Sequence, residues 1–401
     1  MSTPRAILML VVVLSAYLLL YAYLARRLFG AYRRATTFRK ILWWLLLAAA
    51  PLSLLGWFSG RLFTRSIWTV SLQWVGLSIM GWFYLTLVVV TVRDVWLFLL
   101  RRFRKNPTPP PSKAEGNGVS RRAFLQRTTS LAVVATSSAV SIDGIRSARK
   151  TAAPKYVDIP LPNLHPDLDG FVILQLSDIH VGDTIGRRYV ERIVERCAEI
   201  NADMIAITGD LVDGTVQELQ DDVAPIFDLD APHGVFFVTG NHEYYVDAPS
   251  WIRHLQENGL HVLLDEHVVL THGDASLVVA GIADYSAPSM VPAHRSDPAK
   301  ALQGAPTDAT RVLLAHQPRS YPQTKGLNVD LQLSGHTHGG QIWPFTYLVL
   351  LQQPFIAGLH KVWGSMWLYI SRGTGYWGPP MRVASPAEIT VLTLRRAPEE
   401  R

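Results

Sequence analysis

The chain has only one cysteine in 401 residues, Cys197, so no disulfide can form within it. Cysteine usage therefore gives no information about whether the protein works in an oxidising compartment. Cys197 lies in the stretch YVERIVERCAEI, which has helical spacing. We interpret it as a small buried hydrophobic residue of a helix.

Acidic residues are scarce in the first 150 positions, where only Asp94, Glu115 and Asp143 accompany 21 Lys and Arg, giving 21 − 3 = +18. The remaining residues hold 17 basic and 29 acidic side chains and sum to −12. The net charge of +6 is thus the sum of two opposite parts and does not indicate a nucleic-acid partner. A basic membrane part joined to an acidic soluble part fits these charges.

Charged residues are absent from three long apolar stretches, 6–25, 41–58 and 68–92. Helices of this length can cross the roughly 30 Å hydrocarbon layer of a bilayer. We predict three transmembrane helices within residues 1–105. Because the spans contain no charged side chain, they do not indicate a transport pathway.

Basic residues in the connecting loops predict the orientation of these spans. Loop 26–40 carries six Lys and Arg, whereas loop 59–67 carries two. The first loop is therefore expected in the cytoplasm, with the N-terminus outside. Residues 106–122 form a basic, proline-rich linker that is expected to return to the cytoplasm.

Residues 118–134, GVSRRAFLQRTTSLAVV, resemble a twin-arginine export signal, with Arg121 and Arg122 at its centre. We interpret residues 123–150 as this signal or a fourth apolar segment. The twin-arginine export machinery is then a partner, and the protein is multi-pass in the cell membrane with residues 151–401 on the extracytoplasmic, periplasmic face. The alternative is a juxtamembrane segment that contains two arginines by coincidence and leaves the last domain in the cytoplasm.

Short apolar runs typical of buried strands alternate with helical stretches after residue 168. The runs are 171–176, 204–208, 234–239, 277–282, 311–316 and 330–335. This alternation predicts an α/β fold whose strands are buried on both faces.

Five of these runs are followed directly by side chains that can bind a metal. The residues are Asp178, His180, Asp210, Asn241, His242, His316, His336 and His338. Ligands of α/β sheets bind at the carboxyl ends of strands. Each residue alone has an ordinary explanation as a turn residue or a structural histidine, but their joint placement favours a metal site.

The order of these motifs, DxH, GD, GNHE, H and GHTH, resembles the calcineurin-like metallophosphoesterases over about residues 155–394. The tail SRGTGYWGPPMRVASPAEITVLTL is similar to the branch with membrane-associated and export-tagged bacterial phosphodiesterases. The resemblance implies a sandwich of two mixed sheets flanked by helices, here preceded by an all-helical transmembrane region.

The resemblance also implies two divalent metal ions and their ligands. One ion is expected on Asp178, His180, Asp210 and His338, and the other on Asp210, Asn241, His316 and His336. Oxygen and nitrogen ligands without a thiolate suit Mn, Fe or Zn. His242 is expected to face the leaving group rather than a metal, and Asp213 and Glu243 are expected to orient ligand histidines.

The expected activity is hydrolysis of a phosphate ester by a metal-bridging hydroxide, with His242 as general acid. We expect a membrane-anchored phosphodiesterase whose substrate is a component of the cell envelope or linked to a lipid. One alternative is a nucleotide-sugar-lipid pyrophosphatase at the cytoplasmic face. A second alternative, from another class, is a catalytically inert membrane sensor or scaffold.

Two interpretations are open for residues 343–355, WPFTYLVLLQQPF, directly after the last ligand motif. They form either packed strands of the second sheet or an apolar rim that touches the bilayer or an acyl chain. For the later run 366–371, MWLYIS, we predict a strand.

Overall fold

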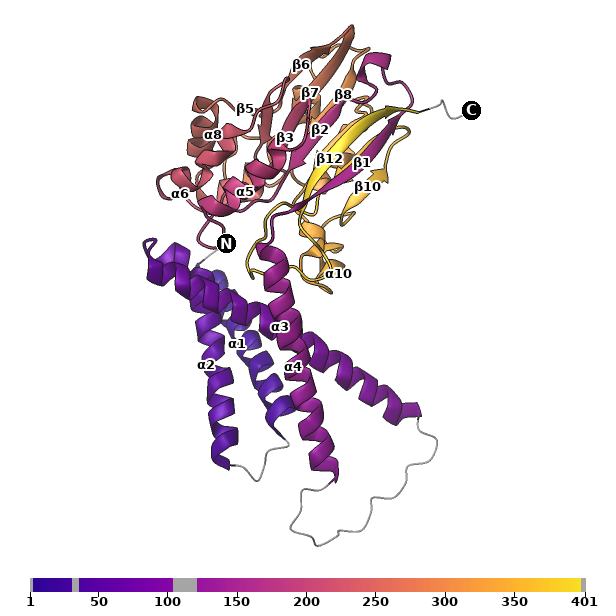
Figure 1. Ribbon diagram of the computed structural model, residues 1–401. Coiled ribbons are helices and arrows are strands. Elements are labelled where there is room, and N and C mark those ends of the chain that lie inside the picture. Colours follow the sequence, from indigo (N-terminus) through magenta and orange to yellow (C-terminus); the bar gives the residue numbers. More distant parts are fainter. Residues whose placement is uncertain (1–2, 31–35, 104–120, 398–401) are drawn as a thin grey trace. The chain divides into compact units, whose positions relative to one another are not determined.

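The computed structural model describes residues 3–30, 36–103 and 121–397, which form two compact units (Figure 1). The first, Met1–Ile145, is called the helical unit, and the second, Arg146–Arg401, the sandwich unit. Each is described by itself.

The predicted spans all lie within long helices. The helices are α1 (Thr3–Phe29), α2 (Thr36–Leu62), α3 (Ile67–Phe103) and α4 (Arg121–Arg149). Within the described residues, three segments have the length and hydropathy of a membrane span: Arg39–Gly60, Ile67–Phe103 and Phe124–Arg149. The predicted span 6–25 falls within α1, and the fourth apolar segment, 123–150, lies within α4 except for its last residue.

Small and polar residues hold the helical unit together. A Cβ atom on Gly56 of α2 would lie 2.7 Å from Cα of Gly76 in α3, so the two helices approach closely at this pair. Glycines permit such contacts between membrane helices. Asp94 of α3 accepts a 2.6 Å hydrogen bond from the hydroxyl of Tyr23 and pairs with Arg27, both in α1.

Parts of the predicted targeting region lie outside the described residues. These parts are residues 106–120 of the linker, which include Ser120, and Arg33 and Arg34 of the first loop. The twin-arginine signal and the orientation of the spans therefore stay predictions.

The sandwich unit consists of two six-stranded mixed sheets. The first has the order β1-β12-β2-β3-β4-β5 and the second β10-β11-β9-β8-β7-β6. The strands are β1 (Ala153–Leu161), β2 (Val172–Leu176), β3 (Met204–Thr208), β4 (Val235–Val238), β5 (His261–Val262), β6 (Glu266–His272), β7 (Ala275–Gly281), β8 (Thr310–Leu314), β9 (Leu331–Ser334), β10 (Gly358–Lys361), β11 (Trp367–Ile370) and β12 (Glu388–Arg396).

Side chains that alternate along the strands form three cores around these sheets. Ile173 and Phe236 of the first sheet share one core with Leu333 of the second, so the sheets pack face to face. On the other face of the first sheet, Leu174 packs in a core with Trp251. The helices are α5 (Arg187–Ala198), α6 (Val216–Val223), α7 (Asn241–Val246), α8 (Ala248–Glu257), α9 (Pro298–Ala301) and α10 (Thr346–Val349). The predicted sandwich flanked by helices is confirmed.

Six predicted strands match β2, β3, β4, β7, β8 and β9 within two residues at each end, and the run 366–371 contains β11. The packed-strand interpretation of residues 343–355 is wrong. That segment contains the short helix α10, and its backbone N–H groups bond three or four residues back, as from Leu348 to Phe345 (2.8 Å). Pro344 and Pro354 lack the N–H groups that a ladder of strands requires.

Candidate metal centre

The predicted ligands gather at one edge of the sandwich unit because their strands run side by side. Strands β2, β3 and β4 are parallel neighbours in the first sheet, and β8 and β9 are parallel neighbours in the second. Their carboxyl ends therefore meet, and we call this place the carboxyl edge. All eight predicted site residues lie there. Six are buried, and His242 and His336 are half-buried.

The backbone at this edge adopts an uncommon conformation. Five predicted ligands have φ between 50° and 71°: Asp178, His180, Asp210, His336 and His338. Few residues other than glycine adopt this left-handed region, and such positions cluster at functional sites. Gly240 gives the space that these turns need, since a Cβ atom there would lie 2.2 Å from Oδ1 of Asp210.

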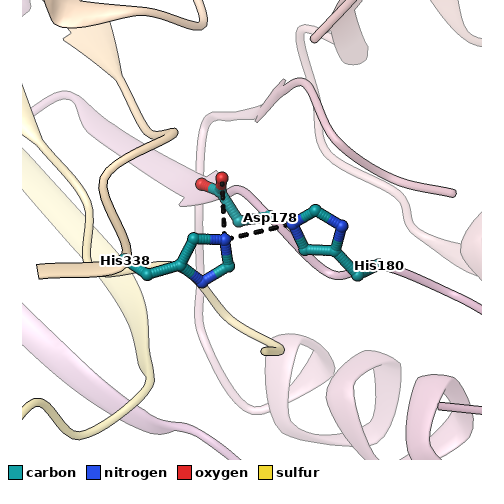
Figure 2. A group of neighbouring side chains, drawn as sticks. All are labelled: Asp178, His180 and His338. Atoms are coloured by element: carbon teal, nitrogen blue, oxygen red, sulfur yellow. Dashed lines mark hydrogen bonds and ion pairs between the residues drawn. The ribbon is translucent and has the colours of Figure 1, made fainter. Parts of the chain in front are cut away.

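The first cluster consists of Asp178, His180 and His338, whose side chains point toward one another (Figure 2). Nε2 of His180 lies 3.1 Å from Nε2 of His338. Nε2 of His338 lies 3.4 Å from Oδ1 of Asp178. The three side chains thus offer two nitrogens and one oxygen to a common point.

The second cluster consists of Asp210, His316 and His336. Nε2 of His316 lies 3.1 Å from Oδ2 of Asp210 and 3.2 Å from Nδ1 of His336. The same Oδ2 is 3.8 Å from Nε2 of His180 in the first cluster. Asp210 therefore lies between the two clusters, and its role as a bridging ligand stays a prediction.

Asn241, the remaining predicted ligand, has a buried Oδ1 for which the described residues provide no hydrogen-bond partner. A buried polar atom without a partner is costly unless another group satisfies it. The amide oxygen suits a hard or borderline cation. The lack of a hydrogen-bond partner for this buried oxygen thus fits the predicted role as a ligand.

The separations between nitrogens also fit a metal. Nitrogen ligands bound at about 2.0–2.1 Å around one ion lie about 2.9 to 3.4 Å apart. The two observed separations, 3.1 and 3.2 Å, fall in this range. The geometry alone also groups His242 with His180 and Asp210, so its assignment as a group that does not bind metal stays a prediction.

Neighbouring acceptors fix which nitrogen of His316 and of His180 faces the centre. Nδ1 of His316 donates to the carbonyl oxygen of Thr208 (2.8 Å), and Nδ1 of His180 lies 3.1 Å from Oδ1 of Asp213. In these tautomers, Nε2 keeps a lone pair for a metal. Asp213 thus contacts a ligand histidine as expected.

The expected role of Glu243 is wrong, because its carboxylate contacts backbone amides and no ligand histidine. It accepts hydrogen bonds from the N–H groups of Gly240 (2.7 Å), Asp210 (3.1 Å), Leu211 (2.7 Å) and Val212 (3.2 Å). The helix that carries Glu243 begins directly after β4, so the carboxylate reaches the loop after β3. Glu243 therefore joins two ligand-bearing loops.

The pKa values of His336 and His338 are shifted in the opposite direction to that of His242. Burial lowers the pKa of His336 to about 3, with a further contribution from His316, and burial also lowers the pKa of His338. Both are neutral, the form that binds metals. Burial acts in the same direction on His242, but the negative charges of Asp210 and Asp213 outweigh it and raise the pKa of His242 to about 9.

Arg382 is a buried contributor that the sequence analysis missed. Its Nη2 lies 3.3 Å from Nδ1 of His338 and 2.6 Å from the carbonyl oxygen of Gly375. Its Nη1 donates to the carbonyl oxygen of Ser385 (3.0 Å). No spacing or motif in the tail singled out this arginine from the others.

Comparison with known proteins places these features in a family. Residues 171–340 match the family described as calcineurin-like phosphoesterase. The chain is 36% identical over 293 residues to a Danio rerio "transmembrane protein with metallophosphoesterase domain", covering 71% of this chain and 66% of the relative. It is 32% identical over 224 residues to an uncharacterized metallophosphoesterase of Aquifex aeolicus, covering 56% of this chain and 84% of the relative.

The protein belongs to the calcineurin-like phosphoesterase family. The matches span slightly less than two thirds of the length of the first relatives. Among solved structures, a dimetal phosphatase from Danio rerio aligns with a TM-score of 0.35 at 11% identity, over 51% of this chain and 88% of that structure.

Proposed function

We propose that this protein is a membrane-anchored, two-metal phosphodiesterase. The observation that carries the proposal is the position of Asp210, whose Oδ2 lies 3.1 Å from His316 in one cluster and 3.8 Å from His180 in the other. No predicted ligand is missing from the edge, which disfavours an inert sensor or scaffold.

Two divalent ions, of Mn, Fe or Zn, would be held by the seven predicted ligands. Asp178, His180, Asp210 and His338 would hold one ion, and Asp210, Asn241, His316 and His336 the other. When bound, such a pair supplies Lewis-acid activation of water and of the phosphoryl oxygens. Two ions with two carboxylates leave a positive site, which favours an anionic phosphate ester.

His242 would hold the proton for the leaving oxygen. Its Nδ1 lies 2.6 Å from Oδ1 of Asp213, which orients the ring and stabilises the imidazolium. The second ring proton, on Nε2, can then pass to the departing alcohol oxygen. The rings of Tyr245 and Trp377 lie beside His242, with centroid separations of 5.1 and 5.4 Å, and would limit the approach of a substrate.

The substrate class is tested by comparing two chromogenic esters. Purified full-length protein, supplied with each metal in turn, is assayed with a phosphodiester and with the matching monoester. The proposal predicts a higher kcat/KM for the diester. A preference for the monoester would contradict it, and turnover of a nucleotide-sugar lipid alone would support the pyrophosphatase alternative.

The sandwich unit would lie on the extracytoplasmic face of the cell membrane, delivered there by the twin-arginine export machinery. The basic loop 26–40 and the pair Arg121-Arg122 support this orientation. The net charge of −12 after residue 150 disfavours a nucleic-acid substrate. A topology reporter fused after Arg401 tests the orientation, and a cytoplasmic signal would overturn it.

A further inference from the structure

The segment of residues 343–351, which follows the last ligand motif, carries an unusual number of exposed apolar side chains. We call this segment the apolar loop. Its exposed members are Trp343, Phe345, Tyr347, Leu348, Leu350 and Leu351, with exposed fractions from 46% for Phe345 to 79% for Leu351. The described part of the sandwich unit has six other large exposed hydrophobic residues, namely Tyr156, Tyr245, Val269, Tyr285, Met290 and Trp377. Half of the large exposed hydrophobic residues in the described part of the sandwich unit thus lie in this one short segment.

The composition and backbone of the apolar loop suit an apolar environment. Residues 339–360 contain no Asp, Glu, Lys or Arg. The N–H groups of Leu348, Leu351 and Gln353 bond to carbonyl oxygens within the segment, at 2.8, 3.1 and 2.9 Å. A segment that enters lipid must satisfy its backbone groups internally. Trp and Tyr residues favour the membrane interface.

Both ends of the apolar loop are fixed to the carboxyl edge. At its first residue, the N–H group of Trp343 donates to the carbonyl oxygen of Val383 (3.1 Å). After it, the hydroxyl of Thr337, which stands between the ligands His336 and His338, donates to the carbonyl oxygen of Ile356 (2.5 Å). The loop therefore projects from the same edge as the metal centre.

The chain also enters the sandwich unit at this edge. Ala153, the first residue of β1, pairs with Glu388 of β12, and Thr390 of β12 pairs with Gln175 near the carboxyl end of β2. Only residues 150–152 separate β1 from helix α4, which contains the candidate span Phe124–Arg149. Three residues reach about 10 Å at most. Figure 1 shows α10 at the end of the unit where β1 begins.

We propose that the apolar loop inserts into the interfacial layer of the bilayer that holds the chain's own helices. The three-residue connection limits how far the carboxyl edge can lie from the end of α4. In this proposal the exposed Trp343, Tyr347, Leu348 and Leu351 enter the headgroup and acyl boundary. The metal centre then meets phosphate esters of that membrane, a consequence that rests on the proposed function.

Depth-dependent quenching tests the insertion without requiring catalysis. A fluorophore is attached to Leu348→Cys or Leu351→Cys in the full chain reconstituted in vesicles that contain nitroxide-labelled lipids. The buried Cys197 stays unlabelled. Val269→Cys, an exposed apolar position on β6, serves as the control. We expect at least about twofold quenching at both loop positions and little at 269; equal, weak quenching at all three would overturn the proposal.

A second experiment measures the consequence for substrates. The double variant Leu348→Asp/Leu351→Asp is assayed with a vesicle-borne phosphodiester and with a soluble one. The ratio of the two rates should fall about tenfold, whereas Val269→Asp should leave the ratio within about twofold. An unchanged ratio in the double variant would contradict the insertion. A protein with quenched loop labels but no turnover of either ester would refute the proposed function alone.

Discussion

Oδ1 of Asp213 lies 2.6 Å from Nδ1 of His242, and the same oxygen lies 3.1 Å from Nδ1 of His180. One carboxylate thus orients both a predicted metal ligand and the predicted general acid. Burial alone would raise the pKa of Asp213, but the neighbouring His180 and His242 lower it below its usual range. Asp213 is therefore an anion at neutral pH.

Asp213→Ala should lower both metal content and activity. Loss of a carboxylate that orients a ligand histidine typically costs 10–100-fold in metal affinity or turnover. Metal analysis of the purified variant and steady-state kinetics measure the two effects. Asp158→Ala, which removes an exposed carboxylate paired with Arg395, is the control. Normal metal content together with normal activity in Asp213→Ala would contradict the assigned role.

His242→Asn should slow esters with poor leaving groups more than those with good ones. A general acid contributes roughly 10²–10⁴-fold when the departing alkoxide needs a proton. A nitrophenolate leaves without that help, so its release should depend less on His242. Turnover of an alkyl and a nitrophenyl diester is compared in the wild type and the variant. An equal loss on both esters would indicate that His242 binds a metal or supports the fold instead.

Glu243→Gln should destabilise the sandwich unit. The buried carboxylate accepts four backbone N–H bonds, two on each oxygen. The amide oxygen of Gln can keep two of these bonds, whereas its NH₂ group cannot accept the other two. A hydrogen bond contributes about 0.5–1.5 kcal/mol, and more where one of its groups is charged. At roughly 2–4 °C per kcal/mol for a unit of this size, Tm should fall by several degrees.

Thermal unfolding followed by intrinsic fluorescence measures this change in Tm. Glu191→Gln is the matched control, because Glu191 forms an exposed ion pair with Arg187 and such pairs contribute about 0–1 kcal/mol. A Tm for Glu243→Gln that equals that of the control would refute the structural role of the four bonds.

Cys197 should be inert in the folded protein. Burial raises the pKa of its thiol to about 12, so its thiolate is scarce at neutral pH. A thiol reagent should modify less than one group in ten within the time that it needs to label the unfolded chain completely. Rapid, complete labelling of the native protein would show that Cys197 is accessible.

The position of the candidate metal-ligand clusters could be predicted because it follows from a general property of α/β sheets. Buried strands are visible as short apolar runs, and the residues after β2, β3, β4, β8 and β9 must meet where parallel strands end. Asp178, Asp210 and His316 are separated by more than thirty positions from one another, yet this rule brings them to one edge.

Other features of the sandwich unit could not be predicted from the sequence in this way. Strand β1 contains Pro154 and Pro160 and lies at the edge of its sheet, where prolines are tolerated, so its sequence does not alternate like that of a central strand. Arg382 contacts His338 across 44 positions, and no local pattern marks an arginine for burial. Glu243 follows a ligand motif, but only the folded loops show that its partners are backbone amides.

The apolar loop shows a further limit of pattern analysis. A continuous apolar run fits either a buried strand or an exposed lipid-facing segment, because both lack polar side chains. The exposure of Tyr347 and Leu351 separates these alternatives only in the folded unit. An apolar run without alternation therefore predicts that the segment lies in an apolar environment. It does not predict whether protein or lipid forms that environment.

Metal reconstitution tests the central claim most directly. The full-length protein is stripped of metal, resupplied with Mn, Zn or Fe, and assayed with a chromogenic phosphodiester beside Asp210→Asn. We predict about two bound ions per chain, turnover only after metal is restored, and loss of turnover in Asp210→Asn, because Asp210 lies between both clusters. A folded, metal-loaded protein without turnover, or an Asp210→Asn variant with normal turnover, would contradict the two-metal account.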